Sequence, residues 1–151
     1  MKNQFNILKK SRALTLKAID GLTLEQLHKI PEGFKNNIAW NIAHLVVTQQ
    51  LLHYKLSGLN CLCPDDLIET HKKGTFPTTV FSQEEFNEVL DLFNGLPETL
   101  EEDFEAGIFE KFIEYPTSTG FVLNSIETAI PFNNYHEGLH LGIIMSIKKF
   151  V

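Results

Sequence analysis

Apolar residues recur at intervals of three and four through most of the chain, and this helical periodicity restricts the fold more than any other feature of the sequence. Glycine and proline separate the periodic segments, as expected where helices end or break. The pattern predicts four main helices, over residues 3–19, 36–57, 82–104 and 124–149. Four helices with long connections between them predict an all-α fold, a helical bundle with long crossover loops.

The predicted helix ends rest on capping residues. Gly21 can take the left-handed conformation that ends a helix, and either Asn36 or Asn37 can cap the start of the second helix. Ser82 and Glu85 have the spacing of a capping box at the start of the third.

Glycine and proline also predict interruptions. Gly95 and Pro97 should interrupt the third helix, and Pro131 should kink the fourth helix or split off its first turn, because proline lacks the amide hydrogen that continues a helix. We expect residues 58–80 to form a long loop and residues 107–123 to be irregular.

Length and composition are those of an ordinary globular domain. The 151 residues are close to the commonest domain size, which predicts a single domain over residues 1–151. The net charge is −6, and the chain lacks the clustered cations of a nucleic-acid surface. It has no signal-peptide pattern, no apolar run long enough to cross a bilayer, and only two cysteines. We therefore expect a cytoplasmic protein that binds neither nucleic acid nor membrane.

His136 and His140 are four residues apart in the last predicted helix. At about 100° per residue, this spacing stacks both imidazole rings on one face of the helix, about one turn apart. Two nitrogens so placed can share a metal ion. Imidazole is a ligand for zinc, nickel, iron and copper alike, so the pair predicts a divalent metal site without selecting the metal.

The same stretch matches the zinc-peptidase pattern H-E-x-x-H, in which the glutamate, here Glu137, is the general base. Peptidases of that class usually take a third ligand from further along the chain. The segment that follows His140 contains no histidine and no carboxylate side chain. A peptidase is therefore the least favoured of the functions considered.

A third ligand must then come from upstream, and His44 is the best placed, in the middle of the most apolar helix. His53 lies about 180° round that helix from His44, so both cannot face one site. His28 and His71 fall in predicted loops, where we expect them to be exposed and without a role. The predicted metal ligands are His44, His136 and His140.

Several polar and aromatic residues are candidates for a pocket wall or for orienting the histidines. They are Asn37, Trp40, Asn41, Thr48 and Asn133. Simpler interpretations also hold for three of them: Asn37 can cap its helix, Asn133 can offset the break at Pro131, and Trp40 can belong to the core.

Cys61 and Cys63 could bind a soft metal together with His53 or His71. A pair of reduced loop thiols without a role is the simpler interpretation.

The stretch W-N-I-A-H-L at residues 40–45, followed by the H-x-x-x-H pair on the last helix, resembles the DinB/YfiT-like superfamily. The resemblance covers nearly the whole chain in the order of its elements. It implies an antiparallel four-helix bundle, often a homodimer, in which His44, His136 and His140 bind nickel, zinc or iron. The chain departs from the family after His140, where Leu141-Gly142-Ile143 stands in place of a frequent Arg-Gly-Gln.

The resemblance also implies a function. Some members are S-transferases or isomerases that use low-molecular-weight thiols. Three protein ligands leave a coordination position open, where a metal can lower the pKa of a thiol or water and yield a nucleophile. We therefore expect a metal-dependent enzyme that acts on a small molecule, of thiol S-transferase or hydrolase type, with Glu137 as its candidate acid or base. The alternative is a non-catalytic metal-binding or stress-related protein.

Overall fold

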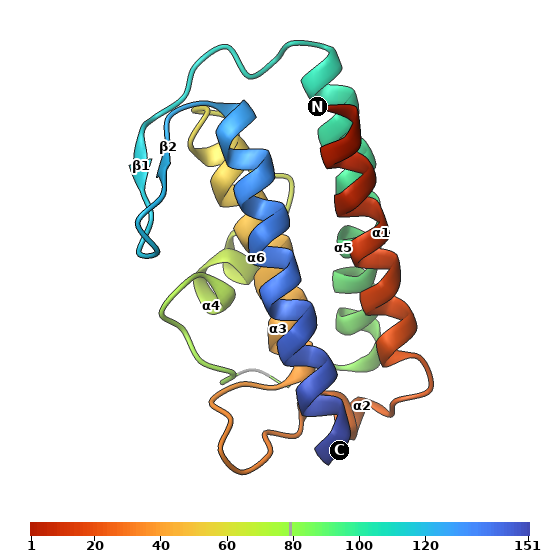
Figure 1. Cartoon of the computed structure of the whole chain (residues 1–151). Helices are drawn as coiled ribbons and strands as arrows, with labels where there is room; N and C mark the ends of the chain where they lie inside the picture. The colour runs from red at the N-terminus through yellow and green to blue at the C-terminus, as the bar shows by residue number, and fades with distance from the viewer. Residues whose placement is uncertain (79) are drawn as a thin grey trace.

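The computed structural model describes residues 1–78 and 80–151. It is mostly helical, which confirms the all-α prediction in its main part. Four long helices lie side by side (Figure 1): α1 (Lys2–Ile19), α3 (Ile38–Gln50), α5 (Gln83–Glu105) and α6 (Ile126–Ile147). The shorter elements are α2 (Leu24–His28), the π-helical turn η1 (Leu51–Lys55), α4 (Asp65–His71), the strands β1 (Tyr115–Pro116) and β2 (Val122–Leu123), and the 3-10 turn η2 (Lys148–Phe150).

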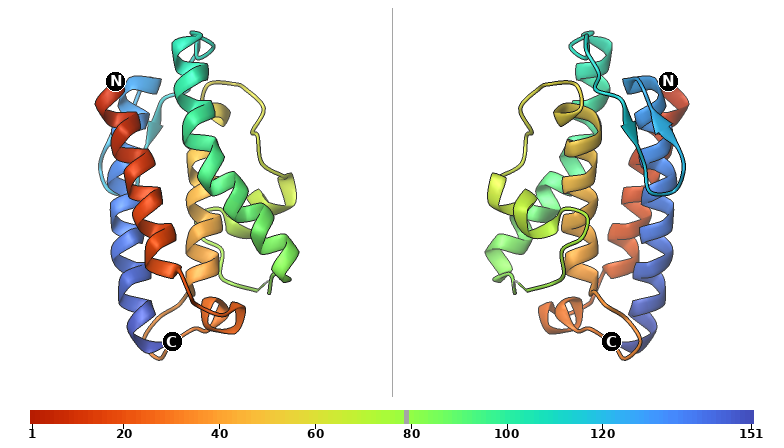
Figure 2. Two further views of the ribbon diagram at one scale, coloured as in Figure 1. Left: turned by 90° about the vertical axis from the view of Figure 1, so that its right-hand side faces the viewer. Right: turned by 90° about the vertical axis from the view of Figure 1, so that its left-hand side faces the viewer.

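Neighbouring long helices are not all antiparallel. In Figure 1, α1 and α6 both begin at the upper end, whereas α3 and α5 both begin at the lower end. The α1–α6 and α3–α5 pairs therefore run parallel, and the α1–α5 and α3–α6 pairs run antiparallel. The antiparallel order that the resemblance implies therefore holds for the α1–α5 and α3–α6 pairs and not for the other two pairs. The reason is the long connection between η1 and α5, whose described residues carry the chain back along α3 (Figure 2).

The helix ends follow the predicted capping residues. At the start of α3, the Trp40 amide donates a hydrogen bond to Asn37 Oδ1 at 2.8 Å. Ser82 and Glu85 form the capping box of α5, and Gly21 follows α1 with a φ of 78°. These residues satisfy or replace the backbone hydrogen bonds that a helix end leaves unmade.

The structure corrects two predicted helix interruptions. α5 is continuous through Gly95 and Pro97, and α6 is continuous through Pro131. Pro97 cannot donate to the Phe93 carbonyl four residues earlier. Arg12 Nη1 donates to that carbonyl instead, at 2.8 Å. A buried side chain thus supplies the hydrogen bond that the proline removes.

Two connections are more regular than predicted. Residues 58–80 contain α4, whose first turn carries Asp65 and Asp66. Acidic side chains are favourable there because the N-terminal end of a helix carries a partial positive charge. Residues 107–123 contain the antiparallel β1–β2 hairpin.

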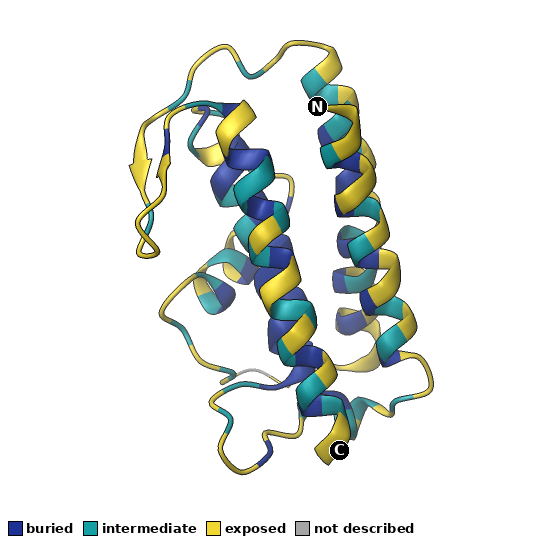
Figure 3. Ribbon diagram, viewed as in Figure 1, coloured by how far each residue is buried: buried dark blue, intermediate teal, exposed yellow. Residues whose placement is uncertain are grey.

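Burial follows the packing of the long helices. Their facing sides are buried, and their outer sides are exposed (Figure 3). α3 is the most enclosed element, since every residue in it except Thr48 is buried. A helix that is apolar on more than one side is expected in such an enclosed position. Within the described ranges, no helix combines the length and the apolar content needed to cross a membrane.

A buried ion pair joins the long helices. Arg12 on α1 and Glu137 on α6 are each 1% exposed. Arg12 donates to Glu137 Oε1 from Nη2 at 2.8 Å and from Nε at 3.1 Å. The same guanidinium donates to the Phe93 carbonyl of α5 at 2.8 Å and to the Leu45 carbonyl of α3 at 3.4 Å. One side chain therefore contacts all four long helices.

Removing one member of this pair should destabilise the protein strongly. Arg12→Met leaves the Glu137 carboxylate buried without its partner, which typically costs about 3–5 kcal/mol of unfolding free energy. The double variant Arg12→Met/Glu137→Leu should recover much of the loss, because neither charge remains. Urea denaturation measures all three proteins. Lys9→Met is the control, since Lys9 pairs with Glu98 and Glu101 near the surface and its loss should cost less than about 1 kcal/mol. An Arg12→Met protein as stable as this control would contradict the role of the pair.

A buried titratable residue, His53, lies in the η1 turn that follows α3. His53 is 0% exposed, and neither of its ring nitrogens has a hydrogen-bond partner among the described residues. Burial lowers the pKa of His53 to about 3; the nearby Ala129 carbonyl opposes the shift and the Arg12 charge adds to it. His53 is therefore neutral in the folded protein at neutral and mildly acidic pH.

Acid should destabilise the protein through this residue. Below about pH 6.5 an unfolded histidine binds a proton, whereas folded His53 does not until about pH 3. The unfolded state then holds more protons, so the unfolding free energy falls as pH falls through this window. His53→Leu should make the slope shallower by up to about 1.4 kcal/mol per pH unit. Urea denaturation between about pH 6.5 and 4.5, with a chelator present, checks this. Equal slopes in both proteins would show that His53 takes up its proton while folded.

Candidate metal centre

Three of the six histidines come together between two antiparallel helices. His44 comes from α3, and His136 and His140 come from α6, one turn apart. One nitrogen of each ring lies within 4.8 Å of the corresponding nitrogens of the other two. The ring centroids of the three pairs are 4.4, 4.9 and 5.2 Å apart. The predicted ligand set is thus a cluster in space.

The spacing of these nitrogens is close to that of a metal site. An ion that binds each nitrogen at about 2.1 Å holds any two of them no more than about 4.2 Å apart. Small rotations of the rings would therefore bring the cluster to bonding geometry. Three imidazoles without a carboxylate form a donor set that suits zinc, nickel or iron. The residues present fit a divalent ion.

Hydrogen bonds fix which nitrogen two of the rings present. His44 Nδ1 donates to the His71 carbonyl at 2.6 Å, and His140 Nδ1 donates to Asn41 Oδ1 at 2.7 Å. The Asn41 amide is itself oriented, because its Nδ2 donates to the Asn37 carbonyl at 2.6 Å. With the proton held on Nδ1, Nε2 of each ring carries the lone pair that a ligand needs. In His44 this lone pair accepts a hydrogen bond from Thr48 Oγ1 at 3.3 Å, which a bound ion would replace.

Burial keeps all three rings neutral. It lowers the pKa of His44, although the hydrogen bond to the His71 carbonyl opposes this. Burial lowers the pKa of His136 to about 4, with a further contribution from His44. Burial also lowers the pKa of His140 to about 3, helped by the two other rings. At neutral pH no proton has to leave before these nitrogens bind a cation.

His136 differs from the other two rings. Its Nδ1 is buried and has no hydrogen-bond partner among the described residues. A buried polar atom without a partner is costly and needs an explanation. One explanation is that this nitrogen gains its partner only when a ligand binds. A neutral ring, which has a free lone pair, is consistent with that explanation.

The other predicted pocket residues take different positions. The Trp40 ring stacks on His44, with centroids 4.6 Å apart and 10° between the ring planes. Thr48 Oγ1 lies 3.3 Å from His44 Nε2. Asn37 uses its side-chain oxygen to cap α3. Asn133 is fully buried, and neither polar atom of its side chain has a partner in the described part of the chain.

The side chain of Glu137, the predicted acid or base, points into the core between the long helices. Its Oε1 is held by Arg12. It belongs neither to the histidine cluster nor to the residues that line the adjoining cavity. The ion pair accounts for a buried glutamate at this position, and the geometry offers no support for a peptidase base.

The structure corrects the expectation for two further histidines. His71 ends α4, is 2% exposed, and supplies the carbonyl that orients His44. Its ring stacks on Phe81, with centroids 5.3 Å apart. His28 is half-buried at the end of α2 and accepts a hydrogen bond from the Phe81 amide at 3.0 Å. The role of His71 could not be predicted from the sequence, because any residue type provides a backbone carbonyl.

The two cysteines are free thiols outside the histidine cluster. Burial raises the pKa of Cys61, and it raises the pKa of Cys63 to about 12. Both are therefore protonated at neutral pH and poorly suited to act as nucleophiles.

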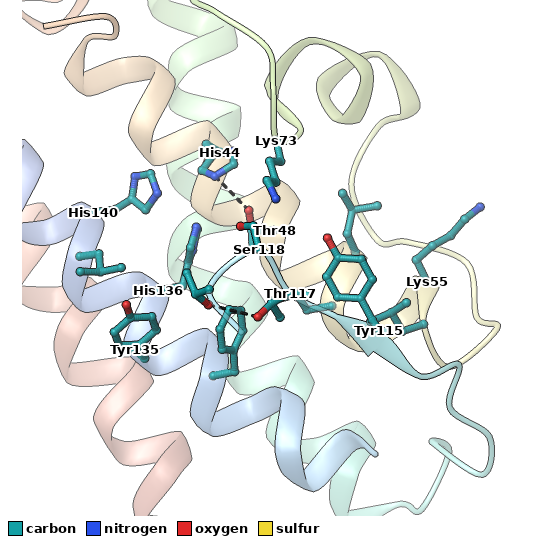
Figure 4. A pocket seen from close by; sticks show the side chains of 16 residues that line it. His44, Thr48, Lys55, Lys73, Tyr115, Thr117, Ser118, Tyr135, His136 and His140 are labelled. Atoms are coloured by element: carbon teal, nitrogen blue, oxygen red, sulfur yellow. Dashed lines mark hydrogen bonds between the residues drawn. The ribbon is translucent and has the colours of Figure 1, made fainter. Parts of the chain in front are cut away.

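A cavity of about 480 Å³ adjoins the histidines (Figure 4). All three rings line it, together with parts of α3, η1, α6 and the β1–β2 hairpin. Its apolar walls are Leu51, Leu52, Leu56, Phe132 and Leu139. Its hydroxyl groups come from Thr48, Tyr115, Thr117, Ser118, Thr119 and Tyr135. The volume and the mixture of surfaces are typical of a site for a small molecule.

Comparison with known families agrees with this arrangement. The sequence profile of the DinB superfamily matches residues 7–144, which is most of the chain. No curated protein matches the sequence. The family match and the order of helices and histidines lead to one conclusion: the chain belongs to the DinB superfamily.

Proposed function

We propose that this protein binds one divalent metal ion through His44, His136 and His140 and uses it to act on a small molecule. The observation that carries the proposal is the set of hydrogen bonds from the Nδ1 atoms of His44 and His140, which leaves the lone pair of each ring on Nε2, beside a cavity. The reaction is of thiol S-transferase or hydrolase type. The four long helices form the helical bundle of this superfamily. The homodimer and the cytoplasmic location remain predictions.

The residues of the chain divide the work. The His71 carbonyl and Asn41 Oδ1 hold two of the rings in orientation. The leucine and phenylalanine walls give the cavity an apolar surface for the body of a small molecule. Thr48 Oγ1, at 3.3 Å from His44 Nε2, can accept a hydrogen bond from a small ligand. When bound, a divalent ion with an open position would supply Lewis-acid chemistry and lower the pKa of a thiol or water beside it.

Metal binding should depend on the three rings and on Asn41. Purified protein should hold about one divalent ion per chain, as elemental analysis measures, and His140→Ala should lose it. Asn41→Ala should keep the stoichiometry at saturating metal but weaken the affinity about 10–100-fold, because the orientation of His140 is lost. His28→Gln is the control, since His28 lies outside the cluster. Full occupancy in His140→Ala would refute the ligand assignment.

Catalysis should require the metal. Zinc-loaded or nickel-loaded protein should transfer a low-molecular-weight thiol to a small electrophile, or hydrolyse a small ester. Chelation should abolish the activity, and added metal should restore it. Product formation followed by chromatography is the measurement, with His140→Ala as the matched inactive protein. An activity that chelation leaves unchanged would show that the enzymatic proposal is wrong. Metal binding without turnover across both substrate classes would favour the non-catalytic alternative.

A further inference from the structure

The charged residues of the cavity carry one sign. Lys55 and Lys73 line it, and no aspartate or glutamate does so among the residues that the structure describes. Acidic residues outnumber basic ones, 19 to 13, in the chain as a whole. The cavity is therefore positively charged, although the chain as a whole is negatively charged. Local charge of one sign favours ligands of the opposite sign.

These two lysines are also free of internal partners. In the ranges 1–78 and 80–151, neither ammonium group lies within 4.0 Å of a carboxylate. The neighbouring Lys72, by contrast, pairs with Glu69. An unpaired lysine on the wall of a cavity keeps its charge available to a ligand.

The histidine cluster contributes no negative charge to the cavity. All three rings are neutral metal ligands, and no carboxylate belongs to the cluster. Glu137, the nearest acid in sequence, is neutralised by Arg12. The charge of a divalent ion at this cluster would be left for the bound molecule to balance.

Lys73 is the lysine that faces the histidines. In Figure 4 its side chain is directed into the cavity on the side of His44 and Thr48, whereas the Lys55 ammonium is directed away from the rings. Lys73 follows His71 by two residues, so the segment that orients His44 also carries this cation. The hairpin hydroxyls of Ser118 and Thr119 line the same cavity.

We propose that the substrate is an organic acid with an apolar body, and that Lys73 binds its carboxylate. The apolar body lies against the leucine and phenylalanine walls, and the reacting end faces the three histidines. Lys73 is then a specificity-determining residue. This inference rests on the proposed function, because it assigns the substrate class of the same site.

Matched ligands test the proposal. Isothermal titration of zinc-loaded protein with 6-mercaptohexanoate and 6-mercaptohexanol compares an acid with a neutral molecule of the same length. The acid should bind about tenfold tighter, as expected for a hydrogen bond to a charged group. Lys73→Met should remove this preference and leave the affinity for the alcohol unchanged. Lys72→Met is the matched control, since Lys72 is adjacent to Lys73 and already paired with Glu69; it should keep the preference.

The outcomes separate the two proposals. Equal affinities for acid and alcohol, or equal losses of both in Lys73→Met, would overturn the assignment of Lys73 and of the substrate class. Titration of metal-free protein with hexanoate and hexanol repeats the comparison without the metal, and the acid should again bind more tightly through Lys73. Failure of zinc to bind, or thiol affinities that do not depend on zinc, would instead overturn the proposed function.

Discussion

The guanidinium group of Arg12 holds the arrangement on which the rest of the structure depends. It donates to Glu137 of α6 and to backbone carbonyls of α5 and α3, so one side chain from α1 contacts each of the other long helices. Charged groups are seldom left in a core unless they are paired, because their desolvation is costly. The helices can therefore slide past one another only by breaking this group of bonds. Such a constraint fixes register more strictly than leucine packing, which tolerates rearrangement.

The metal centre benefits directly from that register. Leu45 follows His44, and Glu137 follows His136, so the atoms that Arg12 binds are next in sequence to two of the candidate ligands. On each helix the neighbouring side chains point in directions about 100° apart. The side chains of Leu45 and Glu137 therefore point into the core, and those of His44 and His136 point to the cavity. A ligand cluster needs its atoms placed to within a fraction of an ångström, and the ion pair supplies a rigid reference one residue away.

The sequence predicted what local patterns determine and missed what depends on distant contacts. Helical periodicity located the four long helices, and capping residues such as Ser82 located their starts. The four-residue spacing of His136 and His140 brought both rings to one face. The continuity of α5 through Pro97 could not be predicted. The Phe93 carbonyl, which loses the amide partner at Pro97, accepts a hydrogen bond from Arg12, and these two residues are 81 positions apart in the sequence. The support of His44 by the His71 carbonyl was equally invisible, since any residue type provides a carbonyl.

Glu137 shows how a fold can change the meaning of a motif. In H-E-x-x-H the glutamate is useful to a peptidase only if its carboxylate reaches the reacting water. Here Arg12 holds it on the other side of the helix. The cavity consequently lacks a protein carboxylate, and its fixed charges among the described residues are lysines. Because Glu137 pairs with Arg12 in the core and no carboxylate lines the described part of the cavity, the negative charge at this site must come from the bound molecule. The same ion pair that orders the helices therefore also decides the charge of the molecule that the cavity favours.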